Sequence, residues 1–152
     1  MIRMRVVFFA GLFALSACQS ASVRYPTADG QVIAPALAVM AAADAAPQGY
    51  AGTFGFTVLR ADMVGPRLFL NSYPDYRDQR NLSIAIDSRV LPALRDRYGK
   101  DLRAAFLNHE IRVVGVARKT RIAFTVKGRP TDKYYFQTHV AVTDPNQILI
   151  VG

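Results

Sequence analysis

The chain has 152 residues and a formal net charge of +8, from 19 Lys and Arg against 11 Asp and Glu. Hydrophobic residues make up 51% and charged residues 20% of the chain, which are ordinary figures for a globular protein. A single Cys excludes an intrachain disulfide, and one Cys with two His offers no set of ligands for a metal site. The basic balance favours an anionic partner, although a genome that prefers Arg would give the same charge.

The first 17 residues have the composition of an export signal. Arg3 and Arg5 precede an apolar run of ten residues, 6–15, whereas a helix that spans a bilayer needs about 20. Residues 15–18, LSAC, resemble the lipobox of bacterial lipoproteins. The resemblance implies that residues 1–17 are a lipoprotein signal peptide, that lipid is added to the sulfur of Cys18, and that the chain is exported. The alternative is an ordinary secretory signal with a chance cysteine.

The residue after Cys18 bears on the choice of membrane. It is Gln19, where enteric lipoproteins kept in the inner membrane have an aspartate, so the resemblance favours the outer membrane, facing the periplasm.

Residues 18–50 are rich in Ala, Pro, Ser and Gln and predict a tether for the lipidated end. Within them, residues 35–46 (PALAVMAAADAA) favour a short helix, because Ala loses no side-chain entropy and Pro suits the first turn. Isolated helices of this length are marginal in water, so we expect a partly ordered linker that spans roughly 30 Å. The folded domain is then expected at residues 51–152.

The patterns in residues 51–152 predict a mainly β domain with one principal helix. Alternating or continuous apolar residues predict strands at 53–58, 68–71, 82–86, 111–116, 121–127, 133–142 and 148–151. Val90, Leu91, Leu94 and Tyr98 share a helical face that Gly99 closes, and 101–107 favours a second helical turn. Turns are expected at 63–66, 128–132 and 144–146.

This order of elements is that of the OB-fold, a five-stranded barrel with a helix between strands three and four. Four short motifs also resemble those of exported bacterial OB-fold proteins of uncharacterised function: GPRLFLN at 65–71, LSIAI at 82–86, IRVVG at 111–115 and DPNQILI at 144–150. The departure from a compact OB domain is an extended basic hairpin from Arg118 to Val142. A small β-sandwich is the alternative fold.

The basic hairpin is the first candidate binding surface. Its residues combine cations for phosphates with rings that stack on bases or sugars; the candidates are Arg118, Lys119, Arg121, Lys127, Arg129, Lys133, Tyr135, Gln137 and His139. If the face of Arg121 and Lys127 coincides with the face of Tyr135, Gln137 and His139, a charged and aromatic strip results. The alternative is a solvated hairpin in which Tyr134 and Phe136 belong to the core.

The loop 72–81 is the second candidate, with Tyr73 and Tyr76 as stacking surfaces for a sugar or peptide. The alternative is a structural loop that is held by local hydrogen bonds from Arg to Asp.

Sequence motifs of the main enzyme classes are missing. His109 and His139 lie thirty residues apart without a metalloprotease motif, and the chain lacks a nucleophile elbow or a phosphate-binding loop. Thermonucleases also use an OB barrel, but Asp62, Asp75, Asp78 and Asp87 do not reproduce their motif.

We therefore expect no catalysis, cofactor or metal, but a lipid-anchored OB-fold module that binds an anionic polymer, such as an oligonucleotide or lipopolysaccharide glycan, or a protein partner. The alternatives are a structural or envelope-stress lipoprotein that docks on another envelope protein and, more distantly, an exported nuclease.

Overall fold

The computed structural model describes residues 30–151, so the predicted signal peptide and Cys18 lie outside the described residues. The protein is mainly β. Its elements in chain order are β1 (Val32–Ile33), α1 (Pro35–Asp44), β2 (Tyr50–Thr57), β3 (Arg60–Val64), β4 (Arg67–Asn71), β5 (Leu82–Ile86), α2 (Leu91–Tyr98), α3 (Leu102–Phe106), β6 (Glu110–Val126), β7 (Arg129–Val142), the 3-10 helix η1 (Pro145–Gln147) and β8 (Ile148–Ile150).

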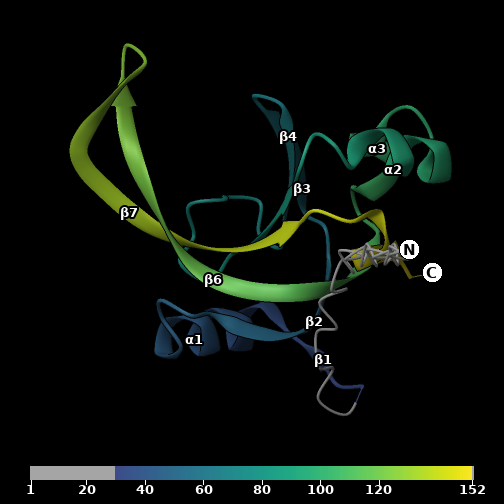
Figure 1. The fold of residues 1–152 in the computed structure, drawn as a ribbon, viewed down its shortest axis with the longest axis horizontal. Helices are drawn as coiled ribbons and strands as arrows, with labels where there is room; N and C mark the ends of the chain where they lie inside the picture. Colours follow the sequence, from purple (N-terminus) through teal and green to yellow (C-terminus); the bar gives the residue numbers. More distant parts are fainter. Residues whose placement is uncertain (1–29, 152) are drawn as a thin grey trace, which may run out of the picture.

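All eight strands belong to one mixed sheet in the order β1-β2-β6-β7-β5-β4-β3, and β8 also pairs with β6. The pairs β1–β2 and β5–β7 are parallel, and the others are antiparallel. Within residues 30–151 no pairing joins β3 to β1, so the sheet is open and does not close as the expected five-stranded barrel does. The sheet is nevertheless strongly curled, and the β6–β7 hairpin and the β3–β4 hairpin extend from it at separate places (Figure 1).

Alternating side chains of the central strands form the core, as the two-residue period predicts. Phe54 of β2, Leu68 and Leu70 of β4, and Ile84 and Ile86 of β5 are buried in one hydrophobic cluster. Burial of each such side chain contributes roughly 1.5–3 kcal/mol to the stability of the folded state. The predicted strands over these three segments are therefore confirmed.

Two short helices connect β5 to β6, where the sequence predicts one helix and a further helical turn. Leu91 and Leu94 of α2 are buried, and Gly99 ends this helix with a φ of 99°. The carboxylate of Asp101 accepts hydrogen bonds from the first turn of α3, and Phe106 contacts the Tyr98 ring edge-on at 5.3 Å. No helix among residues 30–151 is long and apolar enough to cross a membrane.

The structure differs from the sequence interpretation at residues 30–50. β1 pairs with β2, and α1 packs Ala38 and Ala42 into the hydrophobic core, where both are fully buried. The small alanine side chains let the helix lie close to the sheet, and this packing stabilises a helix that would be marginal alone. This part of the predicted tether is thus attached to the sheet.

The β6–β7 hairpin is longer than expected. The predicted strands 111–116 and 121–127 are parts of the single strand β6, and the turn lies at Lys127–Gly128 instead of 128–132. Both turn residues have positive φ, 50° and 77°, as tight two-residue hairpin turns require. The pairing register shifts between Ala123 and Thr125, so β7 bulges near the tip.

Candidate functional site: a groove between two hairpins

A groove with a volume of about 830 Å³ lies between the β3–β4 hairpin and the distal part of the β6–β7 hairpin. Ser83 of β5 and Asn71 of β4 lie in its floor. The complete lining is Arg60, Asp62, Met63, Val64, Phe69, Asn71, Tyr76, Arg77, Ser83, Ile122, Ala123, Phe124, Thr125, Tyr135, Gln137 and His139. Four of the residues predicted from the sequence are among them: Tyr76, Tyr135, Gln137 and His139.

The face predicted for Arg121 and Lys127 does not coincide with the face predicted for Tyr135, Gln137 and His139. Arg121 is paired with Phe136, and residues directly opposite in an antiparallel pair point to the same side of the sheet. Tyr135 is paired with Ile122 and therefore lies on the other side. The hairpin thus has a groove-side face, with Ile122, Phe124, Tyr135, Gln137 and His139, and a helix-side face, with Lys119, Arg121, Tyr134 and Phe136.

Three consecutive side chains on the groove-side face of β7 form a hydrogen-bonded row. Nε2 of His139 donates to Oε1 of Gln137 at 2.7 Å, and Nε2 of Gln137 donates to the Tyr135 hydroxyl at 3.1 Å. The same Gln137 amide also donates to the carbonyl of Tyr76 at 3.1 Å. Gln137 therefore connects the loop 72–81 to the hairpin and fixes the width of the groove here.

Aromatic rings face the groove from both walls. Phe124 lies 5.2 Å from Tyr135, measured between ring centroids, and 48% of it is exposed. On the loop side, the guanidinium groups of Arg60 and Arg77 lie 5.4 and 5.6 Å from the centroid of the Tyr76 ring, and Tyr76 is 38% exposed. These rings are fixed by their neighbours and remain available to a ligand.

The charges on the loop side of the groove are largely compensated. Arg60 binds the carboxylate of Asp62, and Arg77 binds that of Asp75 at 3.2 Å. Hydrogen bonds from the Arg77 backbone and side chain hold the pKa of Asp75 below its usual range. The local Asp–Arg bonds of the structural alternative are therefore present in this loop.

A buried polar network supports the floor of the groove. The Asn81 amide nitrogen donates to Oδ1 of Asn71 at 3.0 Å and to Oγ of Ser83 at 2.9 Å. Its oxygen accepts from the Ser72 hydroxyl at 3.2 Å and from the Tyr73 amide at 3.1 Å. This side chain, which is 2% exposed, thus joins both ends of the loop 72–81 to β4 and β5.

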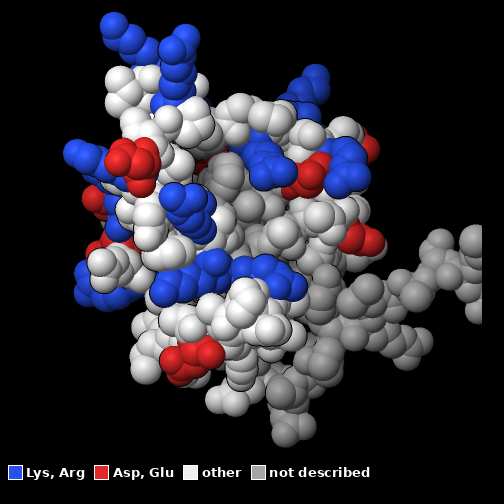
Figure 2. All heavy atoms as spheres, turned by 60° about the vertical axis from the view of Figure 1, so that its left-hand side comes forward, with Lys and Arg blue, Asp and Glu red and all other residues white. Residues whose placement is uncertain are grey.

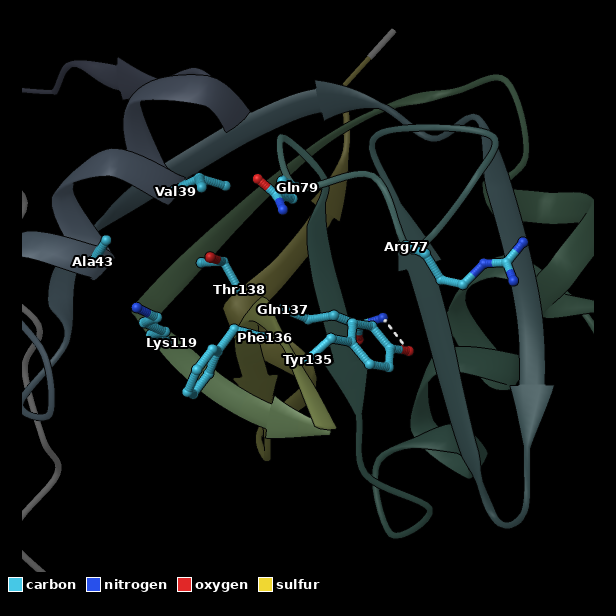
Figure 3. Close-up of a pocket in the computed structure, with 9 residues that line it drawn as sticks. All are labelled: Val39, Ala43, Arg77, Gln79, Lys119, Tyr135, Phe136, Gln137 and Thr138. Carbon is cyan, nitrogen blue, oxygen red and sulfur yellow. Dashed lines mark hydrogen bonds between the residues drawn. The ribbon is translucent and has the colours of Figure 1, made fainter. Parts of the chain in front are cut away.

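The helix-side face carries its own set of basic and aromatic residues. Nζ of Lys119 lies 4.5 Å from the Phe136 ring centroid, and Cζ of Arg121 lies 4.2 Å from that of Tyr134. Tyr134 and Phe136 are 49% and 44% exposed, so the alternative in which these two residues belong to the core is wrong. Both residues lie nearer the tip of the hairpin than Thr138, the residue at which the pairing of β7 with β5 begins. In Figure 3 Lys119 and Phe136 lie on the side of α1, while Tyr135 and Gln137 point toward the loop with Arg77.

The other predicted residues lie outside the groove. Arg118 donates to the carbonyls of Pro47 and Gln48, after α1. Tyr73 packs under the guanidinium of Arg80 at 4.9 Å. Lys127, Arg129 and Lys133 are at the exposed tip of the hairpin. Within residues 30–151, none of the six basic residues predicted from the hairpin forms an ion pair.

Burial lowers the pKa of His139 to about 4, and the positive charge of Arg67 acts in the same direction. An unfolded His titrates near 6.5, so between pH 6.5 and 4 the unfolded chain binds a proton that the folded chain does not. We expect the free energy of unfolding to fall by about 2–3 kcal/mol across this window and this contribution to be constant below it. Urea unfolding at pH 7, 5.5 and 4.5 measures the effect.

Two variants separate this titration from that of other groups. His139→Gln should remove this part of the pH dependence, whereas the variant His109→Gln, at an exposed position, should keep it. Equal pH dependence in the wild type and His139→Gln would contradict the assignment.

The sequence analysis did not identify several residues of the groove. Ile122 and Phe124 were visible as the apolar positions of a predicted strand, but only the register shows that they lie beside Tyr135. Arg60 and Asp62 were missed because β3, with the sequence RADMV, has no clear alternation. For Asn71, the sequence predicted only the last residue of a strand and no role in a site.

Across the described part of the chain, no group of three or more His, Cys, Asp or Glu residues is arranged to hold a metal ion. Comparisons of the sequence with models of known protein families and with curated proteins find no match.

Proposed function

We propose that this protein is a non-enzymatic binding module, lipid-anchored through Cys18 at the outer membrane and facing the periplasm, that holds an anionic polymer in the groove. The observation that carries this proposal is the groove itself, which joins exposed rings on both walls to a row of hydrogen-bonding side chains on β7. Such a surface suits bases or sugars that stack on Tyr76, Phe124 and Tyr135 while their polar edges meet Gln137 and His139.

An OB-type barrel is the fold that we infer for this module. Only Val58 and Leu59 separate β2 from β3, and the backbone bonds change partner there. The amide of Val58 donates to the carbonyl of His109 beside β6, and that of Leu59 donates to the carbonyl of Asn71 in β4. β2 and β3 can thus be regarded as two halves of one bent first strand, with β4, β5, β6 and β7 as the other four.

With this assignment of strands, the groove lies on the face that OB barrels use to bind ligands. With β2–β3 as strand one, β4 and β5 are strands two and three, and the parallel β5–β7 pair is the contact between strands three and five. OB barrels bind oligonucleotides and oligosaccharides on the face of strands two and three, between the loops that connect strands one to two and four to five. Here those loops are the β3–β4 turn and the tip of the β6–β7 hairpin.

The preference for an anionic ligand comes from the hairpin tip. Lys127, Arg129 and Lys133 follow directly on the groove wall at Phe124 and Thr125, and Asp132 is the acidic residue beside them. Figure 2 shows Lys and Arg side chains gathered at the tip. Phosphate or sulfate groups of a ligand in the groove would lie near these uncompensated cations.

The test is binding of a fluorescent single-stranded oligonucleotide and of a soluble phosphorylated polysaccharide, measured by anisotropy at several salt concentrations. Phe124→Ala with Tyr135→Ala should weaken binding at least about tenfold, since stacking on one ring contributes about 1–3 kcal/mol. The matched control removes the rings of the other face, Tyr134→Ala with Phe136→Ala, and should change affinity less than about twofold.

The cations at the tip of the hairpin are expected to contribute to the salt dependence of binding. Lys127→Gln with Arg129→Gln should reduce the slope of log K against log salt by about 1.4 for the oligonucleotide, from two lost phosphate contacts. If the groove variant and its control were equally weakened, or if neither probe bound, the proposal would be wrong.

Docking on another envelope protein is a second candidate, and one observation favours it. The two walls end in exposed apolar residues, Met63 and Val64 on β3 and Val126 on β6. A partner held by these residues would be recovered from envelope extract at both low and high salt, because apolar contacts do not depend on counterion release.

A further inference from the structure

The helix-side face of the hairpin lies on the opposite side of β6 and β7 from the groove-side face and has a different chemistry. Its two cations, Lys119 and Arg121, lie over the rings of Phe136 and Tyr134, and neither forms an ion pair among the described residues. The two rings contact each other edge-on at 5.6 Å. Basic and half-exposed aromatic side chains therefore lie side by side on this face.

α1 extends this surface with apolar residues. Val39 and Ala43 line a cavity of about 410 Å³ together with Lys119 and Phe136 of the hairpin. The remaining lining is Arg77, Gln79, Tyr135, Gln137 and Thr138, of which Arg77, Tyr135 and Gln137 also line the groove. On the outer side of the helix Met40 is 63% exposed, and Leu37, further round the helix, is 54% exposed. Asp44, in the last position of α1, is the only charged residue of the helix.

From this combination we propose that the helix-side face and α1 dock on the anionic phospholipid surface in which the lipid anchor sits. Aromatic side chains are enriched at membrane interfaces, apolar helix faces enter the boundary of headgroups and acyl chains, and nearby cations are attracted by anionic lipids. The side of the molecule seen in Figure 2 has this character, with Lys and Arg above a largely uncharged region.

The position of the anchor supports this orientation, so the inference rests on the lipidation of Cys18 that is part of the proposed function. Cys18 precedes Pro35 by 17 residues. Even a fully extended chain of 17 residues spans no more than about 60 Å, so the start of α1 stays within that distance of the lipid-anchored cysteine. Docking through this face leaves the groove, on the opposite face of the hairpin, open to the periplasm.

The absence of Trp from the sequence allows a direct test with one fluorescent reporter. Protein comprising residues 19–152 contains every residue of the hydrophobic core and needs no anchor to bind vesicles. Phe136→Trp places the reporter on the helix-side face, and Tyr135→Trp places it one residue away on the groove side. We expect a blue shift of Phe136→Trp with phosphatidylglycerol-containing vesicles, but not with phosphatidylcholine vesicles, and no shift of Tyr135→Trp.

A second measurement tests the charges in otherwise unchanged protein by co-sedimentation with the same vesicles. Lys119→Gln with Arg121→Gln should lower the partition coefficient roughly 25-fold, about fivefold for each cation near an anionic surface. Lys100→Gln with Arg103→Gln changes the net charge equally at exposed positions near α3 and should have a much smaller effect.

The inference would be overturned by equal shifts of the two reporters, by no shift of Phe136→Trp, or by equal losses in the two charge variants. These results are independent of the groove, because no polymer is present and Phe124 and Tyr135 are unchanged in the charge variants. Failure of polymer binding with intact vesicle binding would refute the proposed ligand alone. Absence of lipid on Cys18 in cells would refute the anchored location and the docking orientation, but not the binding of a polymer in the groove.

Discussion

Replacing Asn81 with Ala is expected to lower the free energy of unfolding by about 3–5 kcal/mol. The substitution removes the bonds to Asn71 and Ser83 and leaves the amide of Tyr73 and the hydroxyl of Ser72 without their acceptor. Each buried polar group left without a partner costs about 1–3 kcal/mol, and the missing amide also leaves a small void. Urea unfolding followed by circular dichroism measures this change.

Gln79→Ala is the control for Asn81→Ala, because Gln79 lies in the same loop but is exposed. We expect it to change stability by less than about 0.5 kcal/mol. Asn81 also donates to the Tyr76 carbonyl at 3.3 Å, so Asn81→Ala should weaken ligand binding in the groove under conditions where the variant is still folded. A loss of stability no greater than that of Gln79→Ala would show that the network is not formed in solution.

The second large effect is expected at α1. Ala42→Asp places a carboxylate at a fully buried position within the hydrophobic core. We expect a loss of about 3–5 kcal/mol, because the chain must either bury this charge or release the helix and expose its apolar contacts. The same unfolding measurement applies.

Ala43→Asp provides the matched control for this experiment. The neighbouring residue is exposed, and an acid there has the same unfavourable relation to the C-terminal end of the helix dipole. Ala43→Asp should lower the free energy of unfolding by less than about 1 kcal/mol. If both variants were equally stable, residues 35–44 would behave as the linker that their composition suggests, and α1 would not be part of the folded domain.

The difference at α1 shows what composition could and could not indicate. The sequence PALAVMAAADAA correctly predicts a helix, but its apolar residues are mostly alanines, which give no distinct buried face. Whether Ala38 and Ala42 are buried depends on the surface that the helix meets, and that surface is built from β2, β5, β6 and β7.

At the candidate site too, the residue types alone do not show which side chains become neighbours in the fold. The sequence shows the basic and aromatic residues of the hairpin as one group, but in the structure they occupy two faces with different neighbours. The assignment of faces depends on the pairing of Arg121 with Phe136, and this pairing results from the position of the turn together with the bulge in β7. Regular pairing from the turn at Lys127–Gly128 would place Ile122 opposite Lys133, whereas the register shift between Ala123 and Thr125 places it opposite Tyr135.

The strands with clear two-residue alternation, the helix closed by Gly99 and the long basic hairpin can be predicted from the sequence, because these features depend on local periodicity and on turn-forming residues. Three other features become visible only in the folded chain: α1 joins the core, β6 is one continuous strand, and the groove-side and helix-side residues lie on opposite faces of the hairpin. Those features depend on which distant segments pair and in which register, and pairing is fixed by the packing of the whole sheet, which no local pattern contains.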